Sequence, residues 1–104
     1  MTPPKIKGIF SKEYPGGRSD LFLLDSDRDI HEELISFFRE LGISETNLIE
    51  FDSVTTDVEG YFFVYEKEIK IHLIISERGI NLLIESKIPK EELLDIMERY
   101  FQIF

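Results

Sequence analysis

Apolar side chains recur at helical spacing in one segment in the first half of the chain. Between residues 28 and 41 they form a single stripe, which consists of Ile30, Leu34, Phe37, Phe38 and Leu41. This 3.6-residue period predicts an amphipathic helix that buries one face. Ser26 or Asp27 can cap its first turn, and Gly42 suits the left-handed conformation that ends many helices.

Strand patterns fill most of the remaining chain. Two of them flank a Tyr-Pro-Gly-Gly turn, and four more follow the first helix, at residues 5–11, 20–25, 49–53, 60–65, 69–75 and 80–85. A second helix is predicted to open at Pro89, because proline suits the first helical position. Its apolar stripe consists of Leu93, Met97, Tyr100, Phe101 and Phe104.

The order of these elements is β-β-α-β-β-β-β-α, which predicts a single α+β domain over residues 1–104 with residues 1–4 frayed. One-sided helices and alternating strands favour an antiparallel sheet of five to six strands with two helices packed on one face. The first two strands are expected to form a hairpin, and one interrupted strand is the alternative.

Hairpin register predicts which side chains face away from the helices. A loop at residues 76–79 pairs Ile75 with Ile80, and a two- or four-residue loop before residue 69 pairs Val64 with Ile69. The residues expected on the uncovered face are then Tyr61, Phe63, Tyr65, His72, Ile74 and Leu83. A three-residue loop would place Phe62 and Val64 there instead.

The uncovered aromatic stripe has three interpretations. The C-terminal segment 101–104 could cover it as part of a core, a second protein could bind it, or it could hold a small ligand. Aromatic side chains are enriched both in cores and in protein interfaces. Core and interface are equally favoured, and the functional prediction rests on the interface.

Charge is distributed unevenly along the chain and narrows the choice of partner. The formal net charge is −9, with +2 on residues 1–24 and −11 on the rest. So negative a surface repels phosphate backbones, which argues against nucleic-acid binding. Without cysteine there is no disulfide or thiolate chemistry. No membrane span or signal peptide is predicted, and a cytoplasmic location, from a thermophilic or archaeal source, is expected.

Candidate catalytic groups lack the spacing that known chemistries need. His31 has no second histidine four residues later, and residues 25–29 lack the glycine and glutamate of a calcium loop. No catalytic residue, metal or cofactor is therefore predicted. We expect a small acidic non-catalytic protein-interaction domain that forms a homodimer or binds a protein partner, through its open sheet face or its acidic surface. The alternative is a small-ligand or metal-assisted enzyme with a site near Asp52, Asp57 and His72.

Overall fold

One six-stranded sheet organises the molecule. The computed structural model describes residues 4–24, 30–52, 58–76 and 79–103. The strands in chain order are β1 (Lys5–Tyr14), β2 (Gly17–Leu24), β3 (Val58–Val64), β4 (Ile69–Ser76), β5 (Gly79–Ser86) and β6 (Gln102–Ile103). Their spatial order is β3-β4-β5-β2-β1-β6, with β1 and β6 parallel and every other neighbouring pair antiparallel. The expected α+β class is confirmed.

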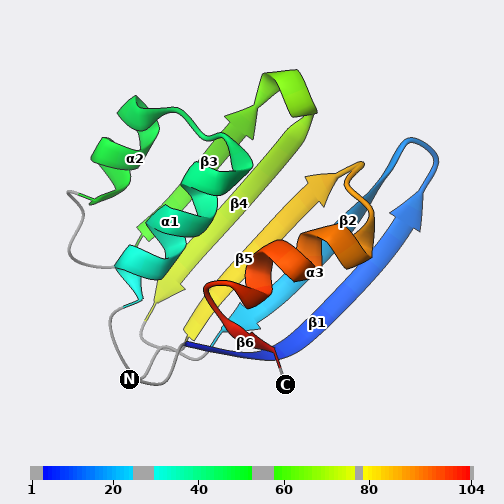
Figure 1. The fold of residues 1–104 in the computed structure, drawn as a ribbon, viewed down its shortest axis with the longest axis horizontal. Helices are drawn as coiled ribbons and strands as arrows, with labels where there is room; N and C mark the ends of the chain where they lie inside the picture. Colours follow the sequence, from blue (N-terminus) through cyan, green and yellow to red (C-terminus); the bar gives the residue numbers. More distant parts are fainter. Residues whose placement is uncertain (1–3, 25–29, 53–57, 77–78, 104) are drawn as a thin grey trace.

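The two main helices lie on the same side of this sheet. They are α1 (His31–Leu41), in front of β3 and β4, and α3 (Lys90–Glu98), in front of β5 and β2 (Figure 1). The predicted stripe of α1 is buried, including Leu34 and Phe38. Gly42 has a φ of 98°, and the amide of Ile43 donates to the carbonyl of Phe38, as the sequence predicts for this helix end. The proposed caps Ser26 and Asp27 lie outside the described residues.

Aromatic rings join the helices to the sheet. Phe38 on α1 packs 4.9 Å from Phe62 on β3, measured between ring centroids, and Phe37 lies 5.8 Å from Phe101. All four side chains are nearly inaccessible to solvent. The segment after α3 therefore completes the core on the helical side of the sheet.

The prediction of a strand at residues 49–53 is wrong for the part of that segment that the structure describes. Residues Glu45–Asp52 form a short helix, α2, which begins after Ser44. The Ser44 hydroxyl accepts a hydrogen bond from the amide of Asn47, and the Ser44 carbonyl accepts one from the amide of buried Leu48. A serine cap and an acidic first turn thus outweigh the short polar–apolar alternation.

The predicted C-terminal helix is too long. Helix α3 ends at Glu98, and Gln102 then donates its amide to the carbonyl of Pro4. This bond begins the two-residue pairing of β6 with Lys5 and Ile6. The chain leaves the helix because a free edge of β1 is within reach.

The predicted hairpin registers are confirmed. Ile75 pairs with Ile80, Val64 pairs with Ile69, and β1 and β2 form a hairpin that closes at Tyr14 and Gly17. The four residues between β3 and β4 include the 3-10 turn η1 (Tyr65–Lys67) and end at Glu68, whose φ of 54° is left-handed. This register fixes the face to which each side chain on β3, β4 and β5 belongs.

Candidate functional site: the open sheet face

The sheet face opposite α1 and α3 carries a row of apolar side chains that crosses five strands. Pairing brings one residue from each strand into line, in the order Phe10, Leu21, Leu83, His72 and Tyr61. Each of these side chains alternates along its strand with a residue of the buried face. We call this line the apolar row.

The most exposed aromatic side chains of the row lie at its two ends. Phe10 on β1 is 62% exposed and Tyr61 on β3 is 61% exposed, whereas Leu21, Leu83 and His72 between them are half-buried. Leu23 and Ile74 flank the row on one side, and Phe63, 42% exposed, flanks it on the other. Large apolar groups spread over a continuous surface are typical of protein-binding sites.

His72 is held in a fixed orientation in the middle of β4. Its ring stacks on Tyr61 with centroids 4.3 Å apart and planes 5° apart, and its Nε2 lies 2.9 Å from the Glu59 carboxylate. Both partners come from β3, and Tyr61 is the residue paired directly with His72. The two rings therefore stand next to each other across the strands with their faces in contact.

A small hollow of about 240 Å³ opens beside this stack. Its lining consists of Tyr61, Phe63, Lys70, Ile71, His72, Leu83 and Glu85. That volume is below the range of about 300–1,000 Å³ typical of small-molecule sites. The hollow suits a single side chain of a binding partner better than a whole ligand.

The open face and the helical layer differ in net charge. Register places four lysines and glutamates on the open face, counted over residues 8–14 of β1 and over β2 to β5. They are Lys12, Lys70, Glu59 and Glu85, and the other ionisable groups there are His72 and tyrosines. These four charges cancel. The helices α1 and α3 with residues 45–48 of α2 carry eight acidic and two basic side chains, which account for most of the −9 net charge. The acidic surface expected from the sequence is therefore the helical layer.

The structure brings together most of the predicted surface residues. Tyr61, Phe63, His72 and Leu83 line one hollow, and Ile74 lies on the same face in the neighbouring row. Tyr65 is 85% exposed in η1 at the end of the sheet and stacks on Phe63 with centroids 6.0 Å apart. It extends the surface past the last paired residue of β3.

The sequence prediction missed the contribution of the N-terminal hairpin. Phe10, Leu21 and Leu23 lie on the same face as the predicted residues, because β2 pairs with β5 in the centre of the sheet. The alternation of Arg18, Asp20 and Phe22 with Ser19, Leu21 and Leu23 was visible in the sequence. The sequence did not show that β2 pairs with β5, so Phe10 and Leu21 could not be placed next to Leu83, His72 and Tyr61.

The alternative enzymatic site stays a prediction, because only one of its three residues has a described side chain. Asp57 and the side chain of Asp52 lie outside the described residues, and His72 contacts Glu59 and Tyr61. Among the residues that the structure describes, no group of three histidine or acidic side chains is placed to hold a metal. His31 lies at the first position of α1, where it is half-buried.

Comparisons with other proteins leave the geometry as the basis for any function. No family model, curated protein or solved structure matches this chain. None of the helices in the described segments is long and apolar enough to cross a bilayer.

Proposed function

We propose that this chain is a non-catalytic protein-interaction domain that forms a homodimer through its open sheet face. The observation that carries the proposal is the apolar row, which is exposed at its two ends and half-buried between them, on an electrically neutral face of a strongly acidic protein. Burial of such a row against a partner lowers the free energy of the complex, because apolar surface is removed from water.

A second copy is the partner that the charge distribution favours. Two acidic helical layers repel each other, whereas two open faces bring together equal numbers of lysines and glutamates. Lys70 pairs with Glu85 across β4 and β5, so each copy presents both signs side by side. A twofold interface needs such a self-complementary surface.

The open face is large enough for a stable dimer. The molecule measures 36 × 32 × 22 Å, and the sheet lies broadside to the shortest axis (Figure 1). The broad side therefore covers on the order of 1,000 Å². A typical stable interface buries about 800 Å² on each partner.

The oligomeric state of a charged variant tests the proposal. Phe63→Glu adds a carboxylate to the open face without touching the buried side chains, so the wild type is expected to be a dimer and the variant a folded monomer. Thr46→Glu adds the same charge on exposed α2 and serves as the matched control, which should remain a dimer. Light scattering measures the mass and circular dichroism the fold.

Two outcomes would count against the homodimer. A wild type that stays monomeric across the micromolar range removes self-association and leaves a different protein as the occupant of the face. A dimer that persists in both Phe63→Glu and Phe10→Glu places the contact elsewhere on the molecule, because these substitutions charge opposite sides of the open face.

A further inference from the structure

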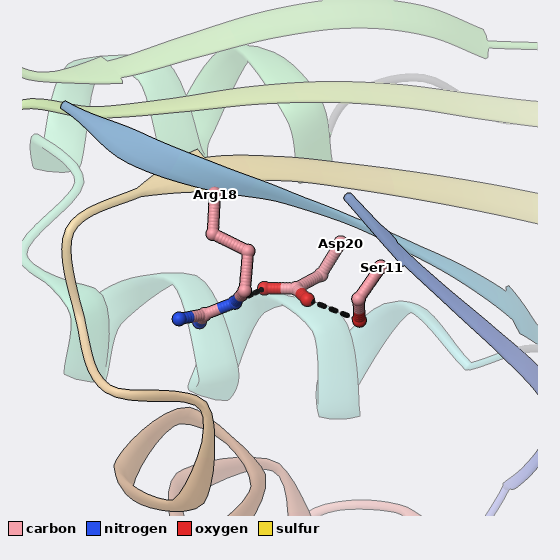
Figure 2. A network of polar contacts seen from close by, with 3 residues as sticks. All are labelled: Ser11, Arg18 and Asp20. Atoms are coloured by element: carbon pink, nitrogen blue, oxygen red, sulfur yellow. Dashed lines mark hydrogen bonds and ion pairs between the residues drawn. The ribbon is translucent and has the colours of Figure 1, made fainter. Parts of the chain in front are cut away.

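A buried polar cluster lies on the helical side of the sheet, beneath the connection from β5 to α3. The guanidinium of Arg18 donates through Nε to Asp20 at 2.7 Å, and the Ser11 hydroxyl donates to the other oxygen of Asp20 at 2.6 Å. Arg18 is 8% exposed and Asp20 is inaccessible to solvent. Figure 2 shows the guanidinium extending away from Ser11, with its terminal nitrogens toward that connection.

Two polar atoms beside this cluster have no hydrogen-bond partner among the residues that the structure describes. They are Arg18 Nη2 and the hydroxyl oxygen of Ser86, which are both buried. The two residues lie directly opposite each other in the pairing of β2 with β5. A buried polar group that lacks a partner destabilises a protein, so a bound group that supplies one is favoured there.

The same two residues line a hollow of about 330 Å³. The rest of its lining comes from the β1–β2 turn and the end of β5, namely Glu13, Tyr14, Gly16, Gly17 and Lys87. This volume is within the range of small-molecule sites. A side chain at Gly17 would come within 3.2 Å of the Ser86 carbonyl and of the Tyr14 hydroxyl, so glycine leaves this lining free of a side chain.

We propose that this hollow binds a small molecule through a carboxylate. A guanidinium offers N–H groups in a planar fork that matches two carboxylate oxygens, and Arg18 uses only Nε for Asp20. The Ser86 hydroxyl supplies a second donor beside it. Contact requires both side chains to turn toward the hollow, a rotamer change of the kind that commonly accompanies binding.

The surrounding charges favour a singly charged ligand. Glu13 is the acidic side chain in the lining, and the ammonium of Lys87 is engaged 2.7 Å from a Glu68 carboxylate oxygen. A doubly charged phosphate would meet stronger repulsion from Glu13 and from the −9 chain than a monocarboxylate would. The hollow lies at the end of the sheet, where its lining includes Arg18 and Ser86 from the helical side and Tyr14 and Gly17 from the open side.

Acetate provides the probe for a titration followed by nuclear magnetic resonance. The Arg18 Nε–H and Ser86 amide signals should shift saturably with acetate, with a Kd on the order of millimolar for a few charge-assisted hydrogen bonds. Sodium chloride at matched ionic strength should not shift them, and phosphate should bind several-fold more weakly. Shifts that are linear, or equal with chloride, would overturn the proposal. Phosphate binding at least as tight as that of acetate would overturn its ligand class.

Two serine variants separate a binding role from a structural one. Ser86→Ala keeps Arg18 and Asp20 paired, and it should weaken acetate binding by about three- to tenfold through the loss of one hydrogen bond. Ser19→Ala, on the opposite face of β2 beside Arg18, should leave the affinity unchanged. Unchanged binding in Ser86→Ala would overturn the assignment of the hydroxyl, and an equal loss in both variants would overturn the site.

Discussion

The two faces of the sheet are built from the same strands, yet they meet opposite requirements. On β4 the helical face consists of Ile69, Ile71 and Leu73, which are almost fully buried, whereas Lys70 is exposed and His72 and Ile74 are half-buried on the other face. Both faces contain large apolar groups. They differ in what surrounds those groups: an acidic layer of helices on one side, and a neutral set of lysines and glutamates on the other.

This comparison shows that hydrophobicity alone does not identify a core. An alternating strand supplies apolar residues to two surfaces, and only the surface that helices cover becomes interior. The placement of charge then indicates which surface can approach another protein. Substitutions on matched positions of the two faces test this division.

The largest difference should appear between phenylalanines on opposite faces. Phe38 is fully buried against Phe62, so Phe38→Ala should destabilise the protein by about 3 kcal/mol or more through lost burial and a cavity. Phe10→Ala removes an exposed ring and should cost less than about 1 kcal/mol in a monomeric background. Urea denaturation measures both. Equal midpoints for the two variants would show that the helical face has been misassigned.

A smaller difference is expected between neighbours on β5. Leu82 is inaccessible to solvent, whereas Leu83 is half-buried in the apolar row. In the Phe63→Glu monomer, Leu82→Ala should cost about 2–4 kcal/mol and Leu83→Ala about 1 kcal/mol. In the wild type the cost of Leu83→Ala should rise with protein concentration, because a dimer contact adds to its burial. A cost that does not change with concentration contradicts that contact.

Duplex DNA should show no detectable binding at physiological salt. Neither the neutral sheet face nor the acidic helices can release many counterions from a phosphate backbone. A gel-shift assay with random-sequence DNA and low micromolar protein checks this. A salt-dependent shift would contradict it and direct attention to Lys5, Lys7 and Lys12 on β1.

The smallest effect concerns one exposed ion pair at the end of the sheet. The hydrogen bond and charge of Lys87 lower the pKa of Glu68, and Glu68 in turn raises the pKa of Lys87. Carboxyl chemical shifts should therefore show Glu68 titrating below its ordinary pKa. In Lys87→Gln the value should return toward normal. Unchanged titration in that variant would contradict the pairing.

The pH dependence that follows has a defined sign. Because the folded state lowers the pKa of Glu68, it holds that proton less tightly than the unfolded chain does. The pair therefore stabilises the fold above the ordinary glutamate pKa, and this contribution is lost as pH falls through the lowered value. Full exposure to solvent keeps the contribution small.

The sequence was sufficient to predict the elements that local chemistry determines. The stripe of α1, the end at Gly42 and the registers around β4 follow from spacing and turn geometry, and the structure has them as predicted. Helix α2 was missed because the prediction for residues 49–53 used only their short alternation and not the cap signal at Ser44. Strand β6 forms by pairing with β1, at the other end of the chain, and no local sequence pattern predicts that pairing.

The candidate site was predictable only in part for the same reason. Tyr61, Phe63, His72 and Leu83 belong to consecutive strands, so hairpin rules place them together. Phe10 and Leu21 join them through the pairing of β2 with β5, which sequence spacing does not determine. The hollow beside Arg18 was likewise not predictable, because Ser86 and Lys87 in its lining come from the far end of β5.

The pairing of β2 with β5 also has a consequence for folding kinetics. It joins residues more than fifty positions apart, whereas β1–β2, β3–β4 and β4–β5 are local hairpins that close early. The seam between β2 and β5 divides the apolar row, leaving Phe10 and Leu21 on one side and Leu83, His72 and Tyr61 on the other. Neither half carries the whole surface, so the proposed binding face is complete only after this long-range pairing has formed.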